Sequence, residues 1–185
     1  MKTPTYIALD VESGGIDPSF SLLTFYLAIL DEHLDVMHEL DLKVKPDDGV
    51  YIIAGEALRV NGINLAVHDL EAITYKEAGT QIYDFLHRVN PGGKFKLIPV
   101  GHNVAFDIKF LCTHTLSKKS WDKFVGYRTL DTGTISMFLM KTGKIPEMNA
   151  SLGSLAKYCG IEFEAHTARG DTLATVGVMK EFLKK

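Results

Sequence analysis

Apolar residues run almost unbroken through residues 5–12 (TYIALDVE) and 21–31 (SLLTFYLAILD), whereas residues 34–46 (LDVMHELDLKVKP) alternate between apolar and polar. A continuous apolar run predicts a strand buried on both faces, and strict alternation predicts a strand with one face in water. A turn rich in Gly, Ser and Pro follows the first run, and a short turn at residues 31–33 joins the other two into a hairpin. The chain is therefore expected to begin with three consecutive antiparallel strands.

Helical patterns dominate the rest of the chain. Residues 75–89 carry apolar side chains at helical spacing after Thr74, a favoured N-cap residue. Residues 96–102 (KLIPVGH) predict one more short strand, and Asn103 and Ser151 stand where N-caps are expected. Four further segments predict helices: residues 104–116, 131–141, 151–158 and 171–184. Strands that alternate with helices after an antiparallel start predict an α/β fold with a mixed sheet.

Length and composition fit one compact domain over residues 1–185, without repeats or linkers. A domain of this size buries roughly 70% of the surface of its unfolded chain, so its core needs no disulfide or structural metal. Cys112 and Cys159 are far apart and form no CxxC motif, so we expect two buried thiols in a reducing compartment. A net charge of −3 means that charge alone would not hold nucleic acid.

The chain carries no sequence signal for a membrane or for export. No apolar run approaches the ~20 residues of a membrane span. The first residues, MKTPTYIALD, lack the apolar core of a signal peptide. We therefore expect a cytoplasmic protein that makes no contact with a membrane.

Two acids interrupt the apolar first strand near its end. Asp10 and Glu12 are two residues apart, so both side chains point to the same face of the strand. Paired carboxylates on a buried strand repel each other and lose hydration, and a bound cation would remove both penalties. A strand end that is open to water would also solvate the pair, so this pair alone leaves both interpretations open.

Two more acids begin predicted helices. Asp107 lies four residues after Asn103, and Asp171 opens the last helix. The helix dipole favours acids at these positions, and for each acid alone this structural role is the simpler interpretation. His166 precedes Asp171 by five residues in HTARGD, and Gly170 suggests that the helix begins just before Asp171. His166 is then expected on a loop, where most histidines are merely solvated.

Taken together, the segments LDVESGG, GHNVAFD and HTARGD resemble the three exonuclease motifs of the DEDDh (DnaQ-like) superfamily. That group includes the proofreading subunit of bacterial replicative polymerase, ribonuclease T and oligoribonuclease. The resemblance extends from Ile7 to the last helix, and three motifs in order at fitting separations form a specific signal. It implies a ribonuclease-H-like fold, with a five-stranded mixed sheet flanked by helices.

The resemblance also implies roles for the residues of these motifs. His166 would be the general base, and two divalent ions, Mg²⁺ or Mn²⁺, would be held by four acids: Asp10, Glu12, Asp107 and Asp171. Hard cations prefer such oxygen ligands. Two ions together activate the attacking water and stabilise the leaving oxygen of a phosphodiester.

Further residues are candidates to hold the substrate. ALRVNGI resembles the A-x-x-V-H-G-I stretch that helps to hold the terminal nucleotide, with Asn61 in place of the usual His. Ser13 and Gly14 stand where the family often has Thr-Thr or Thr-Gly. Ile63 is a candidate to pack against the last base or sugar, although a core position is slightly favoured. Asn103 orients Asp107, donates to a phosphate, or acts as a plain N-cap.

Other polar residues are weighed in the same way. Asp131 in LDTGTIS matches a family aspartate, and a helix N-cap and a role in supporting the metal ligands explain it equally well. His33 and His38 are five apart, on opposite faces of a strand, which favours solvated surface over a metal site. Lys118 and Lys119 could contact a nucleic-acid backbone, but solvated loop surface is favoured.

The expected function is hydrolysis at the 3′ end of single-stranded DNA, with release of nucleoside monophosphates, in proofreading or repair. The alternative is a 3′–5′ exoribonuclease that trims RNA or short oligonucleotides, because the motifs do not read the sugar. A non-catalytic nucleic-acid-binding module is disfavoured, since all four acids and the histidine are present. The expected partners are single-stranded 3′ ends, DNA ahead of RNA. The sequence leaves open a polymerase partner and self-association.

Overall fold

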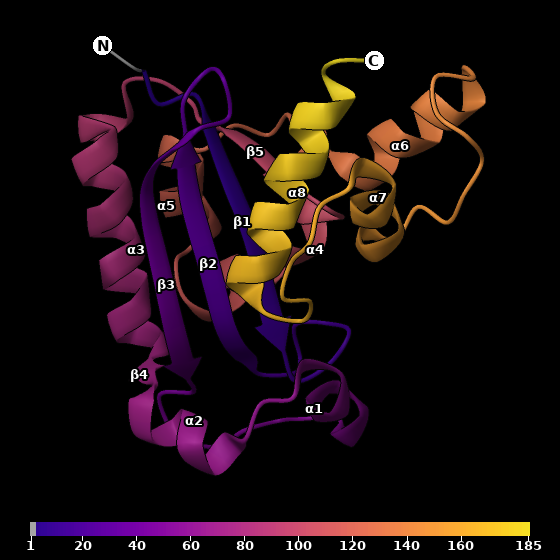
Figure 1. Cartoon of the computed structure of the whole chain (residues 1–185). Coiled ribbons are helices and arrows are strands. Elements are labelled where there is room, and N and C mark those ends of the chain that lie inside the picture. The colour runs from indigo at the N-terminus through magenta and orange to yellow at the C-terminus, as the bar shows by residue number, and fades with distance from the viewer. Residues whose placement is uncertain (1–2) are drawn as a thin grey trace.

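A mixed sheet lies at the centre of the structure, a computed structural model that describes residues 3–185 (Figure 1). The described residues form six strands in the order β4-β3-β2-β1-β5-β6. β1, β2 and β3 pair antiparallel, whereas the pairs β1–β5, β3–β4 and β5–β6 are parallel. The strands are β1 (Tyr6–Ser13), β2 (Leu22–Leu30), β3 (Val36–Lys45), β4 (Ile73–Thr74), β5 (Ile98–Gly101) and β6 (Leu130–Asp131).

The predicted α/β class and the antiparallel start are confirmed, but the expected number of five strands is wrong. The two strands β4 and β6 are two residues long each, too short to leave a periodic pattern in the sequence. They extend the sheet at its two edges.

Eight α-helices flank the sheet in the described part of the chain: α1 (Gly55–Asn61), α2 (Leu65–Glu71), α3 (Tyr75–Val89), α4 (Val104–His114), α5 (Lys118–Phe124), α6 (Thr132–Lys141), α7 (Leu152–Cys159) and α8 (Ala168–Phe182). A short 3₁₀ turn, Pro91–Gly93, follows α3. The sequence analysis missed α1, α2 and α5, which have seven residues each and too few turns to show a helical period. Lys118 and Lys119 therefore lie in a helix and not in a loop.

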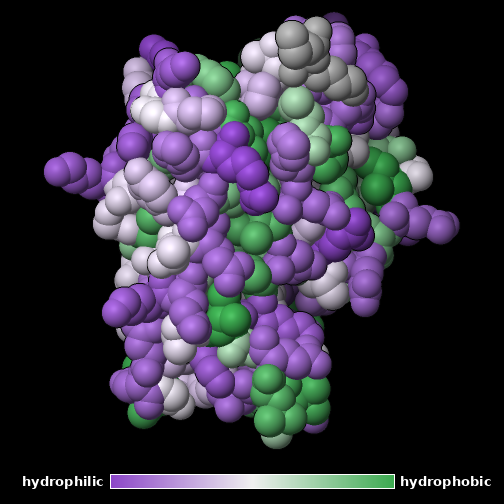
Figure 2. Space-filling view, turned by 90° about the vertical axis from the view of Figure 1, so that its left-hand side faces the viewer, coloured by the Kyte–Doolittle hydropathy of each residue, from purple (hydrophilic) through white to green (hydrophobic). Residues whose placement is uncertain are grey.

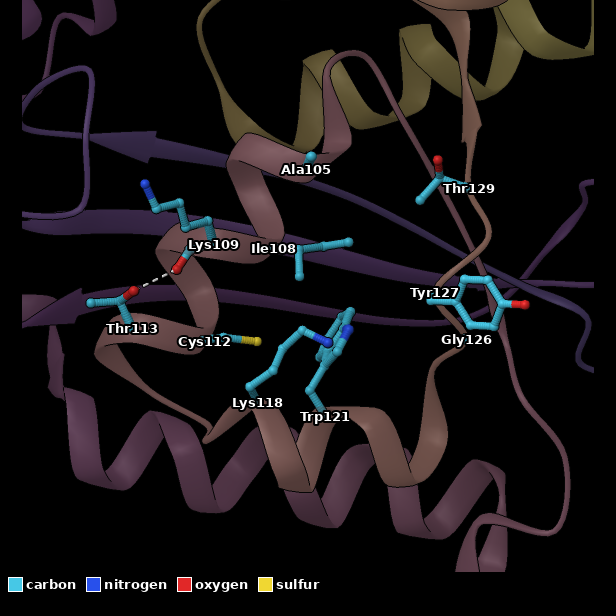
Figure 3. A pocket seen from close by; sticks show the side chains of 10 residues that line it. All are labelled: Ala105, Ile108, Lys109, Cys112, Thr113, Lys118, Trp121, Gly126, Tyr127 and Thr129. Carbon is cyan, nitrogen blue, oxygen red and sulfur yellow. Dashed lines mark hydrogen bonds between the residues drawn. The ribbon is translucent and has the colours of Figure 1, made fainter.

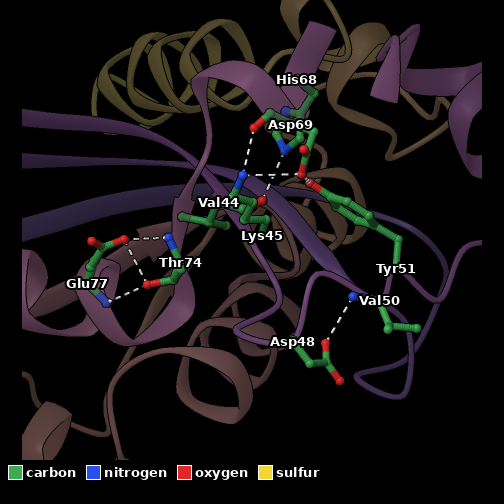
Figure 4. A network of polar contacts seen from close by, with 9 residues as sticks. All are labelled: Val44, Lys45, Asp48, Val50, Tyr51, His68, Asp69, Thr74 and Glu77. Carbon is green, nitrogen blue, oxygen red and sulfur yellow. Dashed lines mark hydrogen bonds and ion pairs between the residues drawn. The ribbon is translucent and has the colours of Figure 1, made fainter. Parts of the chain in front are cut away.

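The last helix begins earlier than predicted. α8 starts at Ala168, because Thr167 is its N-cap and accepts a hydrogen bond from the Gly170 N–H at 3.1 Å. The expected caps of two other helices are confirmed. Thr74 forms a capping box with Glu77 (Figure 4), and Ser151 caps α7, which ends at Gly160 in the left-handed conformation.

The helices divide between the two faces of the sheet (Figure 1). α3, α4 and α5 pack on the face to which β1 turns Ile7, Leu9 and Val11, where they build the largest apolar cluster. α8 covers the other face, to which β1 turns Ala8. A third cluster joins α6, α7 and the second half of α8. Because side chains alternate along a strand, Asp10 and Glu12 share the face of Ala8 and point towards α8.

A polar network fastens α2 and the segment after β3 to the sheet (Figure 4). The Tyr51 hydroxyl donates to Asp69 Oδ1 at 3.0 Å, and Lys45 Nζ lies 3.3 Å from the same carboxylate oxygen. His68, almost completely buried, pairs its Nε2 with the Val44 carbonyl at 2.9 Å. These contacts hold α2 and the segment around Tyr51 against the end of β3.

The outer surface on the side of α3 is largely hydrophilic, with small apolar areas between the polar side chains (Figure 2). None of the helices between residues 3 and 185 combines the length and apolar character that crossing a bilayer requires. Cys112 and Cys159 are free and only partly buried, so the expectation of two buried thiols is wrong. His33 and His38 are exposed, in agreement with solvated surface.

Candidate metal centre and nucleic-acid cleft

Three of the predicted acids meet at the end of β1. Asp10 and Glu12 leave the strand on the side of α8, and Asp171 lies in the first turn of that helix. Each offers a carboxylate oxygen, and the three oxygens lie within 4.8 Å of one another. All three residues are partly exposed, so the group can be reached from solvent.

The fourth acid, Asp107, reaches the same strand from the opposite face of the sheet. The parallel pairing of β1 with β5 ends at Ala8, so beyond it this edge of β1 has no strand neighbour. Asp107 on α4 fills the gap: its Oδ1 accepts a hydrogen bond from the Val11 N–H at 3.2 Å. Its side chain is buried and falls outside the three-residue oxygen group found in residues 3–185. Asp107 is thus fixed at the peptide between Asp10 and Glu12.

The pKa values of all four acids are raised above their ordinary values. Burial raises the pKa of Asp10 well above its ordinary value, and the charges of Asp107, Asp171 and Glu12 raise it further. Burial and the charge of Asp171 raise the pKa of Glu12 to about 7. Burial raises the pKa of Asp107 to about 8 and also raises that of Asp171. The group therefore resists carrying four negative charges by itself.

A divalent cation fits this donor set. The side chains of Asp10 and Glu12 have no hydrogen-bond or ion-pair partner among residues 3–185, and the donors are carboxylate oxygens only. Hard cations such as Mg²⁺ take such oxygens, commonly a few carboxylates together with water. Positive charge at this point would offset the burial cost that raises all four pKa values and the repulsion that adds to it at Asp10 and Glu12.

His166 lies on a loop beside these acids, as expected. Its side chain is exposed, its φ is 62°, and its N–H donates to Asp171 Oδ2 at 3.1 Å. Thr167 Oγ1 donates to the Glu164 carbonyl at 2.9 Å. A Cβ on Gly170 would come within 2.0 Å of that carbonyl oxygen, so only glycine permits this contact. The backbone of the loop is therefore tied to α8, while the imidazole faces solvent.

The start of α4 is held by a residue other than the one predicted. Asn103 stands at the N-cap position with φ 64°, but its side chain makes no capping hydrogen bond and is exposed. Asp131 accepts the Val104 N–H with Oδ2 at 2.9 Å and the Thr134 N–H with Oδ1 at 3.1 Å. Asp131 is thus the N-cap of α6, one of its two predicted roles, and it also secures the helix that carries Asp107. The predicted N-cap position of Asn103 is confirmed, but its side chain does not contribute a capping hydrogen bond.

A cleft opens next to Glu12, with a volume of about 550 Å³. Of the predicted substrate-binding residues, Ser13 and Asn61 line it. Gly14 is buried behind it, where a Cβ would lie 2.8 Å from the Ile52 carbonyl oxygen. Ile63 and Asn103 do not line the cleft, and Ile63 is half-exposed outside the apolar clusters, so the slightly favoured core position for Ile63 is wrong.

Asn61 holds the two sides of the cleft together. Its Nδ2 donates to the Ser13 carbonyl at 3.3 Å, and its Oδ1 accepts the Ile63 N–H at 3.1 Å. The Ser13 hydroxyl donates to the Gly15 carbonyl at 2.6 Å. These bonds tie the end of α1 to the end of β1, so that the cleft and the carboxylates share one backbone segment.

Two aromatic side chains in the cleft were missed by the sequence analysis. Phe20 and Phe106 both line it and are both partly exposed. Phe106 precedes Asp107, and an aromatic residue in the first turn of a helix next to a candidate ligand was the available signal. Phe20 had no such signal, because its ring packs over Gly15 in a turn without periodic structure.

No family model and no curated protein matches this chain. Among the solved structures that share its fold are several of exonuclease I. Exonuclease I of E. coli in complex with a dT13 oligonucleotide has a TM-score of 0.78 at 20% identity, covering 97% of this chain and 41% of that one. The zinc-ion-bound form of the E. coli exonuclease I–ssDNA complex has a TM-score of 0.78 at 20% identity, covering 97% and 40%.

A third similar structure is exonuclease I of Methylocaldum szegediense, with a TM-score of 0.78 at 18% identity, covering 97% of this chain and 40% of that one. At these identities the similarity shows the fold. The chain spans about two fifths of the length of these exonucleases.

Proposed function

We propose that this chain is a two-metal-ion 3′–5′ exonuclease that hydrolyses the last phosphodiester of single-stranded DNA and releases nucleoside monophosphates. The observation that carries the proposal is the meeting of Asp10, Glu12 and Asp171 within 4.8 Å, with Asp107 bonded to the same strand. The three motifs resemble those of the DEDDh superfamily, whose ribonuclease-H-like fold suits the mixed sheet. The fold shared with exonuclease I, including complexes with single-stranded DNA, gives further support.

Asp10, Glu12, Asp107 and Asp171 would hold two ions, Mg²⁺ or Mn²⁺. When bound, these ions supply Lewis acidity that lowers the pKa of water and stabilises the leaving oxygen. The chain supplies the rest of the geometry. Asp107 is oriented by the Val11 N–H and Asp171 by the His166 N–H, so each of these carboxylates is held in one direction before substrate arrives.

His166 accepts the proton of the attacking water on an imidazole nitrogen. Histidine titrates near neutrality, which suits a general base. The loop backbone is anchored to Asp171, so the ring stays close to the carboxylates while its exposed side turns towards solvent. This placement lets the proton leave to bulk water after each turnover.

The cleft beside Glu12 receives the terminal nucleoside. Its volume of about 550 Å³ lies within the usual range of small-molecule sites. Phe20 and Phe106 offer apolar surface for a base, and base–aromatic stacking requires an unpaired strand. Ser13 and Asn61 shape its wall, and the exposed Asn103 at the start of α4 is available to a phosphate.

The test follows the stepwise shortening of 5′-labelled strands in Mg²⁺ or Mn²⁺, with single-stranded DNA, single-stranded RNA and a mispaired duplex compared at equal concentrations. Single-stranded DNA is expected to shorten one nucleotide at a time from the 3′ end. Asp10→Asn should abolish this activity, and Asp84→Asn, an exposed acid on α3, should not. Activity that survives chelation or Asp10→Asn would refute the proposal. Faster hydrolysis of RNA than of DNA would instead identify the chain as a 3′–5′ exoribonuclease.

A further inference from the structure

A second hollow lies on the other side of α4 and is unused by the chemistry described so far. It has a volume of about 530 Å³ and lies between α4, α5 and residues 126–129. Figure 3 shows Ile108, Cys112 and Trp121 turned into the space, with Tyr127 across from them. Trp121 is almost completely buried, so the floor of the hollow is aromatic and rigid. We call it the α4–α5 pocket.

The rim of the pocket carries an aromatic ring in water. Tyr127 is 81% exposed, which is unusual for a side chain of this size. The Arg128 guanidinium carbon lies 5.0 Å from the centre of the ring. A planar ring with a guanidinium beside it is a platform on which an unpaired base can stack.

The surroundings of the pocket are positively charged, although the protein as a whole is acidic. Residues 94–129 contain seven lysines and arginines and only two aspartates, in a chain whose net charge is −3. One aspartate, Asp107, belongs to the carboxylate group, and the other, Asp122, pairs with Lys118. Lys109 lines the pocket, is exposed and has no ion-pair partner among residues 3–185. This segment is therefore the part of the chain suited to a polyanion.

The pocket and the cleft are neighbours around α4. Successive helical residues are turned by about 100°, so Phe106 faces the cleft, Ala105 and Cys112 face the pocket, and Lys109 lies between them. The charge of Lys109, which lines the pocket, reaches Asp17, which lines the cleft. Hydrogen bonds from Ser19 lower its pKa, and the charge of Lys109 lowers it further.

We propose that the α4–α5 pocket with Tyr127, Lys109 and Arg128 holds the single strand a few nucleotides upstream of its 3′ end. The inference rests on the proposed function. The strand leaves the cleft past Phe106, places a phosphate at Lys109, and sets one base against Tyr127 at the mouth of the pocket. An extended strand alternates flat bases with phosphates, which matches the alternation of aromatic and cationic side chains here. A strand long enough to reach from the cleft to Tyr127 should therefore bind more tightly than a shorter one.

The first test compares hydrolysis of a dinucleotide with that of a strand of about twelve nucleotides, a length in the range of single-strand binding sites. Tyr127→Ala is expected to raise KM for the long strand about tenfold, the usual scale for one lost stacking contact. It should leave kcat and the KM of the dinucleotide unchanged. Lys109→Gln should raise KM for the long strand and weaken its dependence on salt.

The matched control is Tyr158→Ala on α7, since Tyr158 also lies under a cation, with Lys185 Nζ 5.6 Å from its ring centre. It should change neither KM. Equal effects of Tyr127→Ala on both lengths, or no effect on the long strand, would overturn the inference. Failure of the wild type to hydrolyse either length would instead refute the proposed function, so the two failures are distinguishable.

The second test reads occupancy of the pocket directly. Cys112 lines the pocket and Cys159, on α7, does not, and both thiols are free and partly exposed. The long strand should slow alkylation of Cys112 by iodoacetamide and leave Cys159 unchanged, and the dinucleotide should slow neither. Equal labelling of Cys112 with and without the long strand would contradict the inference. Protection by an acidic peptide but not by the strand would also contradict it and assign the pocket to a protein partner.

Discussion

The two faces of β1 show how one strand can stabilise the protein and create its site. Ile7, Leu9 and Val11 face α3, α4 and α5 and are buried in the largest apolar cluster. The residues between them, Asp10 and Glu12, face α8, and their pKa values are raised by burial and by like charge. Neighbouring positions along eight residues therefore contribute free energies of opposite sign to folding.

This difference teaches that the site depends on stability made elsewhere. Three carboxylates whose oxygens lie within 4.8 Å of one another would push their elements apart if nothing else joined them. The apolar contacts on the far face of β1, and those of α8 with β1 and β2, keep the acids together. Substitutions on the acidic face should accordingly lower activity more than stability, and substitutions on the apolar face should lower stability more than activity.

The largest expected effect is on the acidic face. Asp10→Asn keeps the size of the side chain and removes one charge from the group. Activity should fall by about a thousandfold, the scale of losing one electrostatic stabiliser of a transition state, while the metal-free protein should melt at a higher temperature because repulsion is relieved. Rates with Mn²⁺ and thermal unfolding in a chelator measure the two effects. A lower melting temperature together with full activity would reverse the comparison.

The next effect concerns the apolar face. Leu9 is fully buried and precedes Asp10 on β1. Leu9→Ala leaves a cavity there, so the free energy of unfolding should fall by about 2–5 kcal/mol. Because Leu9 points away from the acids, the folded variant should keep its rate within a few fold at low temperature. Urea unfolding and rates in the cold test this. A loss of activity as large as that of Asp10→Asn would show that the faces are not separable.

The third effect uses pH. Glu12 and Asp107 have pKa values of about 7 and about 8 in the folded protein, above those of unfolded chains. The folded state therefore binds these protons more tightly, and the stability that they give is complete below about pH 4 and is lost as pH rises through about 7–8. The metal-free protein should lose several degrees of melting temperature between about pH 5 and 8.

Metal ions should reverse this loss, because they bind the deprotonated acids. Mn²⁺ should raise the melting temperature more at about pH 8 than at about pH 6. Asp10→Asn provides the control, since it should weaken both the pH dependence and the response to Mn²⁺. Equal stabilisation by Mn²⁺ at the two pH values would mean that the acids do not bind it.

The smallest effect lies between the two faces. Asp131→Ala removes the acceptor of one N–H of α4 and one of α6, so stability should fall by about 1–2 kcal/mol. Because α4 carries Asp107, activity should fall as well, by about tenfold, as for residues that orient metal ligands. Ser151→Ala, which removes the cap of α7, is the matched control and should lower stability alone.

The sequence predicted those parts of the fold that repeat along the chain. β1 and β2 could be located because burial on both faces leaves a continuous apolar run, and β3 and α3 because burial on one face leaves a period of two or of 3.6 residues. The strands β4 and β6 have two residues each and the helices α1, α2 and α5 seven, so no period could develop. Those elements are set by contacts with distant segments, such as the pairing of β4 with Val44 and Lys45.

The same limit applies to the candidate site. The four acids and His166 were selected by resemblance to the family motifs. The alternation of side chains along β1 also predicted that Asp10 and Glu12 share one face. The aromatic cleft was not foreseen, because Phe20 and Phe106 are distant in sequence and line one cleft only in the folded chain. Nor was the hydrogen bond from the Val104 N–H to Asp131, which joins residues 27 positions apart in the chain. A pattern read along the sequence does not show such distant pairs.

The early end of the β1–β5 pairing, at Ala8, makes the length of β1 critical. One residue inserted between Ala8 and Asp10 would turn both acids into the largest apolar cluster and bring apolar side chains to α8. Two inserted residues would restore the direction but carry the pair beyond Asp107 and Asp171. Point substitutions are therefore tolerated along this strand far more readily than insertions or deletions. Natural variants should differ here in residue identity and not in the number of residues.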